Sequence, residues 1–184
     1  MKTLIIYALL LCGVASAQAQ QITELEEATV KINPYSVMTS SNLDDYSFTI
    51  NENYAGEFHA NPIGFMQENF DIKEFIEAVK ERNYETYVVT FKSTKGFLRA
   101  NFNKHGTLGR TYQKFTNILL PLEVRQDLYK NYKGWTMTKN NYVASGNGDL
   151  LKKEVYKIKI EKDNKSRIIK LTPAMIGSTT VASN

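Results

Sequence analysis

Residues 86–102 read TYVVTFKSTKGFLRANF and decide the fold class, because apolar and polar side chains alternate on both sides of a turn. Alternation with a period of two is typical of a strand with one buried face. Residues 155–171, VYKIKIEKDNKSRIIKL, follow the same pattern without a gap. The apolar residues keep their parity in both segments, as one buried face of an antiparallel sheet requires. We therefore predict two matching β-hairpins.

Helix signals precede the first hairpin. Asn61-Pro62 is typical of a helix start, because Asn caps the free N–H groups and Pro fits the first helical position. Asp71 begins a second helical pattern, in which an acid replaces the Ser or Thr of a capping box. The apolar stripe of this helix comprises Ile72, Phe75, Ile76 and Val79. After the hairpin, a turn at Gly106 leads into a third strand over residues 107–115.

The same order of patterns recurs in the second half of the chain. Pro121 begins a helical pattern that ends at Gly134, and a strand pattern over residues 135–143 follows it. The shared face of this helix comprises Val124, Leu128 and Tyr132. A helix lying on an antiparallel sheet, present twice, defines the α+β class.

Four boundaries follow from these patterns. We predict a first helix-plus-antiparallel-sheet unit over residues 54–117 and a second over residues 118–173. Residues 20–53 are predicted to form an extended polar arm. Residues 28–32 are a possible strand, and residues 33–53 are rich in Ser, Asn and Asp, with one strand-like piece at 47–50. Residues 174–184 form a polar tail.

The N-terminus has the pattern of a secretory signal peptide, residues 1–19. Lys2 precedes an apolar run that is too short to span a bilayer, which needs about 20 residues. Small residues then allow cleavage after Ala17 or Ala19. Cleavage would remove Cys12, the only cysteine, so no disulfide is expected in the mature chain. We therefore expect a periplasmic or secreted protein without a membrane span.

Charge is distributed unevenly along the chain. Residues 18–85 carry 13 acidic and 4 basic side chains, whereas residues 86–184 carry 6 acidic and 18 basic ones. This asymmetry indicates either two parts that attract each other or an anionic partner. The net charge of the whole chain is only +4, so we do not expect nucleic acid as the partner.

Several segments resemble a known family at turn and core positions. They are FLRANFNKHGTL (97–108), LPLEVR (120–125), YKGWT (132–136) and YKIKIEK (156–162). Together they resemble secreted PepSY-like proteins over residues 85–172. The resemblance implies a fold similar to that of β-lactamase-inhibitor proteins, with helices over an antiparallel sheet. It implies no inhibitory residue, and His105 stands where the family more often has an acidic residue.

No catalytic or metal constellation is apparent in the sequence. His59 and His105 are far apart, in a predicted loop and a turn, and both are expected to be solvent-exposed. No G-x-S-x-G motif is present, and Gly146-Asn147-Gly148 lies between strands rather than before a helix, as a phosphate loop would. We therefore predict no enzyme activity, no metal site and no cofactor.

Alternation assigns the side chains of the last hairpin to two faces. Tyr156, Ile158 and Ile160 are predicted to face the helix, so Lys157 and Lys159 face away from it. A face with basic and aromatic side chains can bind anions. It is also what any solvated sheet face looks like.

The neighbouring strands extend this predicted face. Trp135 and Met137 are predicted to point inward, with Trp135 largely buried, which leaves Tyr142 outward. Lys170 alternates with two apolar neighbours and also points outward. The predicted binding face consists of Tyr142, Lys157, Lys159 and Lys170.

Three functional hypotheses are compatible with these patterns. The first is a non-enzymatic binding or inhibitory module of the cell envelope, whose partner is an envelope protein or an anionic polymer. The second is a structural or accessory envelope protein with no ligand of its own. The third, an enzyme of another type, would require a deep pocket with convergent titratable groups.

Overall fold

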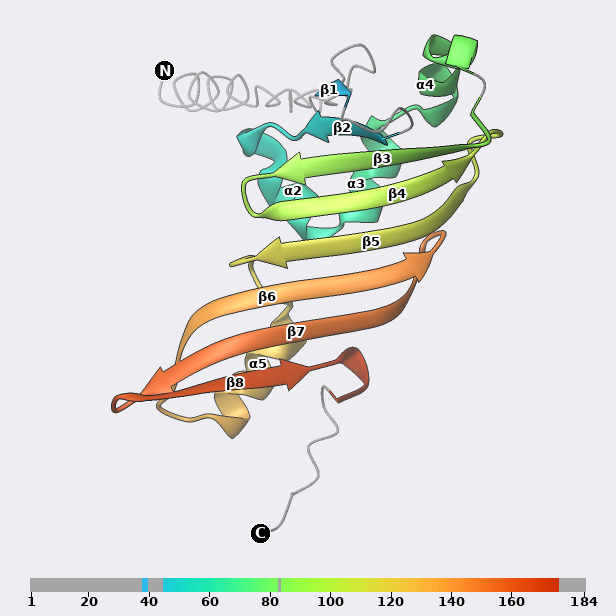
Figure 1. The fold of residues 1–184 in the computed structure, drawn as a ribbon. Coiled ribbons are helices and arrows are strands. Elements are labelled where there is room, and N and C mark those ends of the chain that lie inside the picture. Colours follow the sequence, from blue (N-terminus) through green and yellow to red (C-terminus); the bar gives the residue numbers. More distant parts are fainter. Residues whose placement is uncertain (1–37, 40–44, 83, 176–184) are drawn as a thin grey trace, which may run out of the picture.

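The alternating segments form the strands of one sheet, with helices behind it (Figure 1). The computed structural model describes residues 38–39, 45–82 and 84–175. The strands are β1 (Met38–Thr39), β2 (Asp45–Thr49), β3 (Thr86–Ser93), β4 (Gly96–Asn103), β5 (Leu108–Thr116), β6 (Thr136–Asn147), β7 (Leu150–Lys162) and β8 (Lys165–Leu171). The helices are α2 (Ala55–Ala60), α3 (Pro62–Asn69), α4 (Ile72–Ala78) and α5 (Leu122–Asn131). The predicted signal peptide and most of the predicted arm and tail lie outside the described residues.

The sheet runs from β1 to β8 in chain order, and its ladders are antiparallel except between β2 and β3. The predicted α+β class with an antiparallel sheet is therefore confirmed. Helices α2 and α3 lie behind β3–β5, and α5 lies behind β6–β8 (Figure 1). We call the opposite side of the sheet, which none of the described helices covers, the open face. None of the described helices is long and apolar enough to cross a membrane.

The two predicted hairpins have the same register. The inward pairs of β3 and β4 are Tyr87–Phe102, Val89–Ala100 and Phe91–Leu98. The pairs at corresponding positions of β7 and β8 are Tyr156–Leu171, Ile158–Ile169 and Ile160–Arg167. The match of the two hairpins, predicted from parity alone, is therefore confirmed.

Part of the segment predicted to be an arm belongs to the sheet. Strand β2 pairs in parallel with β3, from Asp45 opposite Val88 to Thr49 opposite Lys92. The buried side chains of this segment are Tyr46, Phe48 and Ile50. The packed structure thus begins before residue 54.

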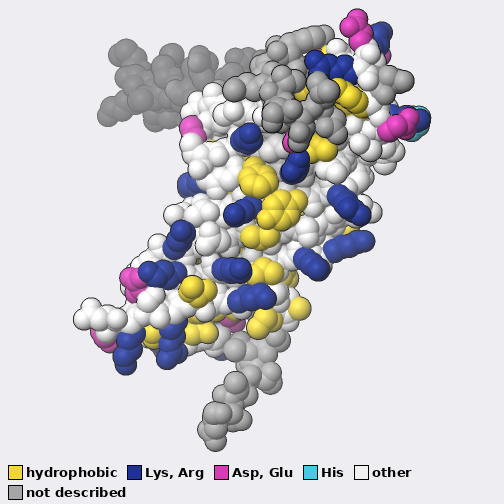
Figure 2. Space-filling model, in the orientation of Figure 1, with side chains coloured by type: hydrophobic (Ala, Val, Ile, Leu, Met, Phe, Trp, Pro, Cys, Tyr) yellow, Lys and Arg dark blue, Asp and Glu magenta, His cyan; other side chains and the backbone are white. Residues whose placement is uncertain are grey.

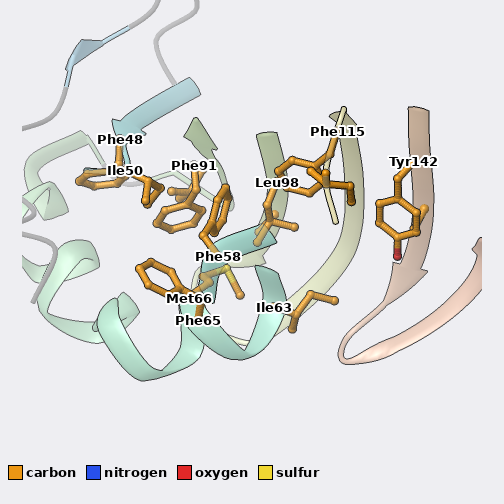
Figure 3. Packing of buried hydrophobic residues seen from close by; sticks show 14 of the residues in the cluster. Phe48, Ile50, Phe58, Ile63, Phe65, Met66, Phe91, Leu98, Phe115 and Tyr142 are labelled. Atoms are coloured by element: carbon orange, nitrogen blue, oxygen red, sulfur yellow. The ribbon is translucent and has the colours of Figure 1, made fainter. Parts of the chain in front are cut away.

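Aromatic rings dominate the core behind β2–β5 (Figure 3). Phe48 stacks on Phe91 with ring centroids 5.6 Å apart, and Phe58 contacts Phe115 edge-on at 5.5 Å. Offset-stacked and edge-on pairs of this kind contribute about 0.5–1.5 kcal/mol each beyond the area they bury. This cluster holds α2, α3 and α4 against the sheet.

The predicted helix starts are present. The Asn61 side-chain oxygen accepts a hydrogen bond from the Gly64 N–H at 3.1 Å, at the start of α3. The Asp71 carboxylate accepts from the N–H groups of Lys73 and Glu74, at 2.9 and 3.0 Å, at the start of α4. Each acceptor satisfies N–H groups that lack a partner within the helix.

A buried asparagine fixes the connection between β5 and α5. Asn140, on β6, donates from Nδ2 to the Ile118 carbonyl at 2.9 Å and accepts from the Ile118 N–H at 3.2 Å. Its backbone N–H donates to the Asn117 side chain at 3.2 Å, and its carbonyl accepts from the Asn117 N–H at 2.9 Å. Asn117 has a positive φ of 54°, which Asn tolerates better than most residues. We call these four bonds the Asn140 clamp.

Trp135 is less buried than predicted. It is partly buried and packs against the edge of the core. Its ring is covered by the Arg167 guanidinium, 5.1 Å from the ring centroid. The prediction of a largely buried tryptophan between sheet and helix is therefore wrong. The side chain that covers the ring is the charged Arg167 and not an apolar core residue.

Candidate binding face

Three of the four predicted site residues lie together on the open face. Lys157 pairs with Lys170 across the β7–β8 ladder, and Lys159 lies two pairs further along, opposite Ile168. The alternating residues of β7, Tyr156, Ile158 and Ile160, are buried on the helix side of the sheet. The prediction that these three lysines face away from the helix is confirmed.

Tyr142 lies on the other side of the sheet, so its predicted place on the open face is wrong. Only 7% of it is exposed, and its ring lies 4.9 Å from that of Tyr156 and 6.4 Å from that of Phe115. A bulge in β6 is the cause. Met137 pairs with Ile160 but Lys139 pairs with Lys159, which leaves one extra residue and reverses the parity of the strand.

The bulge also changes which residues reach the open face. Asn140 and Tyr142 turn inward, and Lys139 takes an outward position beside Lys159. Met137, at the bulge, remains 44% exposed rather than entering the core. The predicted patch therefore gains a lysine where an aromatic ring was expected.

The two buried tyrosines remain uncharged. Burial raises the pKa of both Tyr142 and Tyr156 above the usual range, with a further contribution from the nearby carboxylate of Glu154. The Tyr156 hydroxyl donates to Glu154 at 2.7 Å. These rings therefore act as packing groups beneath the sheet.

Basic side chains are spread across the part of the open face that is visible in Figure 2. By register and alternation they are Lys92, Arg99, Arg110, Lys114, Lys139, Lys153, Lys157, Lys159 and Lys170. Among the described strand residues on this face, the carboxylates are Asp45 and Glu161. Asp45 pairs with Arg99 at 2.8 Å and Glu161 with Lys159 at 2.6 Å.

Only two of these cations, Arg99 and Lys159, have an ionic partner among the described residues. The others, which include Lys114, Lys139, Lys157 and Lys170, form no ion pair within that part of the chain. Two of them, Lys157 and Lys170, lie directly opposite each other. Like charges at paired positions destabilise a sheet slightly. The face therefore keeps a net positive charge that its own described side chains do not neutralise.

Apolar side chains lie among the cations. The Phe97 and Tyr112 rings are 5.8 Å apart. Lys114 lies between Phe97 on one side and Val143 on the other, and Val143 pairs with Val155. Figure 2 shows this apolar strip surrounded by Lys and Arg.

One end of the open face is hollowed. A depression of about 730 Å³ is lined by Arg99, Asn101, Arg110, Tyr112, Asn147 and Lys152 among others. Gly146 belongs to the lining, and the β7 backbone passes so close to it that a Cβ there would come within 2.2 Å of the Leu150 carbonyl oxygen. A second β6–β7 bulge beside Gly146 brings Lys152 to this hollow.

His59 differs from its prediction. It lies in α2 and is partly buried, with Nε2 2.8 Å from the Ser93 hydroxyl, whereas His105 is exposed in its turn as expected. The Ser93 hydroxyl also donates to the Gly96 carbonyl and accepts from the Lys95 N–H. His59 thus fastens α2 to the β3–β4 turn. Among described residues, no group of His, Cys, Asp and Glu could hold a metal ion.

The environment of His59 makes stability depend on pH. Burial and the nearby Lys95 lower the pKa of His59 below 6.5, so protonation favours the unfolded chain. We expect the contribution of His59 to the free energy of unfolding to be complete above pH 6.5 and to be lost progressively as the pH drops below that value. Denaturant titrations of His59→Gln should show a shallower fall over this window, whereas His105→Gln should follow the parent. Equal slopes for all three proteins would contradict this assignment.

No family model matches this chain, and no curated protein or solved structure matches it either.

Proposed function

We propose that the protein is a secreted or periplasmic, non-enzymatic binding module whose open face binds an anionic partner. The observation that carries the proposal is the excess of cations on that face. Arg99 and Lys159 have carboxylate partners, whereas Lys114, Lys157 and Lys170 have none within the described residues. The partner is an anionic polymer or an acidic envelope protein, and the interleaved apolar strip adds contact area that a simple charged surface lacks.

The dimensions of the cationic surface support an extended partner. Alternate residues on a strand are about 6.7 Å apart, and neighbouring strands about 4.8 Å apart. From Arg110 to Lys159 the face extends through four such steps along the strands, or about 27 Å. A small anion would reach only one or two of these cations. A linear polyanion would contact several of them together.

We further propose that the module consists of two PepSY-like units, and the repeated hairpin register supports this. An inward pair such as Tyr87–Phe102 has its counterpart at the same place in the second hairpin, Tyr156–Leu171. A helical segment precedes the strands of each unit, with α2–α4 before β3 and α5 before β6. One continuous sheet would then present the outward faces of both units to the same ligand.

Binding to a defined polyanion tests the proposal. Protein expressed from the full-length chain would be applied to immobilised alginate and poly-L-glutamate at low and high salt. We expect the parent to bind and to release as salt rises, because exposed charges are screened over about 10 Å at 0.1 M. The variant Lys114→Gln/Lys157→Gln/Lys170→Gln should bind at least tenfold more weakly.

A matched variant tests whether binding depends on the lysines of the open face or only on the net charge of the protein. Lys73, Lys130 and Lys133 are exposed on or beside helices, so Lys73→Gln/Lys130→Gln/Lys133→Gln makes the same charge change away from the open face. This control should bind within twofold of the parent. Equal losses in both variants, or no binding by the parent at low salt, would contradict the proposal. The second result would favour a structural or accessory protein without a ligand.

Export is tested in the same preparation. The intact mass of the recovered protein should correspond to a chain that begins at Gln18 or Gln20. A chain that retains Met1 would contradict the secreted part of the proposal.

A further inference from the structure

A second candidate site lies on the helix side of the sheet, between the helices of the two halves. We call it the interhelical groove. It has a volume of about 460 Å³, and α2, the β3–β4 turn and the segment leading into α5 contribute to its walls. Small-molecule sites usually enclose about 300–1,000 Å³ and are mostly apolar with a few polar groups.

The rim of the groove exposes apolar side chains. Leu119 is 81% exposed, and Leu122, at the start of α5, is also exposed. The Asn140 clamp fixes the backbone immediately before Leu119, at Asn117 and Ile118, so this segment is held in place. Tyr142 and Tyr156 line the groove below. Apolar groups displayed on a fixed segment are typical of a binding surface.

The titratable groups at the groove's upper walls are all basic. His59 and Lys95 come from the first half and Arg125 comes from α5, and no carboxylate belongs to the described lining. The Arg125 Nε is buried and has no hydrogen-bond partner among the described residues. Because Nε itself is closed to solvent and Arg125 as a whole is only partly buried, a ligand carboxylate would meet the guanidinium at its other nitrogens, where a hydrogen bond between charged groups is stronger than a neutral one.

We propose that the interhelical groove binds a small amphipathic carboxylic acid. The carboxylate accepts hydrogen bonds from Arg125 and Lys95. The apolar body lies against Leu119, Leu122 and the tyrosine rings. This site is separate from the polymer-binding face, because the sheet lies between them.

Decanoate is a suitable probe, and 1-decanol is its uncharged counterpart. The two ligands would be titrated into isotope-labelled protein, expressed from the full-length chain, and followed by amide chemical shifts. We expect decanoate to shift the amides of residues 117–125 and of α2, and to bind at least tenfold more tightly than decanol. Arg125→Gln should reduce decanoate affinity at least tenfold. Lys114→Gln, on the open face, should leave it unchanged.

A blocking variant keeps the test independent of charge. Gly56 lines the groove, and a Cβ at this position meets nothing within 4 Å, so Gly56→Leu adds bulk without a clash at the backbone. We expect this variant to fold and to lose decanoate binding. The proposal is overturned by equal affinities for decanoate and decanol, by shifts confined to other surfaces, or by no binding up to about 1 mM decanoate.

Discussion

Replacing Phe75 with alanine is expected to lower the free energy of unfolding by about 3–5 kcal/mol. Phe75 comes from α4 and is 0% exposed. Its ring contacts those of Tyr46 at 4.8 Å, Phe70 at 5.5 Å and Tyr87 at 6.0 Å. Truncation would leave a cavity where a helix meets β2 and β3, and rigid strands cannot collapse to fill it.

Urea denaturation measures this loss as a lower midpoint at an unchanged slope. Tyr129→Ala is the matched control, because Tyr129 is 77% exposed on α5 and its truncation should change the stability by no more than about 0.5 kcal/mol. A Phe75→Ala midpoint equal to that of the parent would mean that α4 does not pack on β2 and β3 as described.

The second large effect is expected at Gly96, where β3 turns into β4. Its φ is +151°, and a Cβ there would lie 2.0 Å from the Lys114 carbonyl oxygen and 2.7 Å from the Phe115 Cα. Both atoms belong to the β5 backbone, which cannot retreat without breaking its pairing with β4. We expect Gly96→Ala to cost about 3 kcal/mol, from the combined backbone strain and overpacking.

Thermal or urea unfolding of two alanine variants provides the comparison. Gly56 lies in α2, and the position that a Cβ would occupy there has no neighbouring atom within 4 Å, so Gly56→Ala should stabilise the helix by about 0.5–1 kcal/mol. The same chemical change should therefore have opposite signs at the two positions. A Gly96→Ala variant as stable as the parent would show that β4 and β5 are not paired at Gly96 and Phe115 as described.

Features of the fold that depend on local chemistry could be predicted from the sequence. The caps at Asn61 and Asp71 act on N–H groups two or three residues away. The alternation around Lys157 and Lys159 survives because β7 and β8 pair without a shift along that stretch. Short-range rules are sufficient where partners are close in sequence or where one face is uniformly buried.

The candidate face could be predicted only in part, because one bulge reverses β6. Parity counted from Trp135 places Tyr142 outward, but the extra residue after Met137 places it inward. A bulge is set by the pairing of two strands. The run Lys139-Asn140-Asn141, which interrupts the alternation, is the sequence signal that lies nearest to it.

The other differences between the predictions and the structure arise from contacts between residues that are distant in sequence. His59 bonds to Ser93, 34 residues away, so no local pattern indicates that it is held. The apolar alternation of Tyr46, Phe48 and Ile50 is present in the sequence, but its partner strand β3 lies beyond three helices. The cations of the interhelical groove likewise meet only after the two halves have folded onto one sheet.

The parallel β2–β3 ladder has a consequence for the order of folding. The hairpins from β3 to β5 and from β6 to β8 close over short turns, whereas β2 pairs only after the intervening chain has formed α2, α3 and α4. Contacts between distant segments form more slowly than local ones. During synthesis, β2 leaves the ribosome well before its partner exists, so Phe48 and Ile50 remain uncovered until β3 arrives. The first half of the molecule therefore passes through a stage with an exposed aromatic strand.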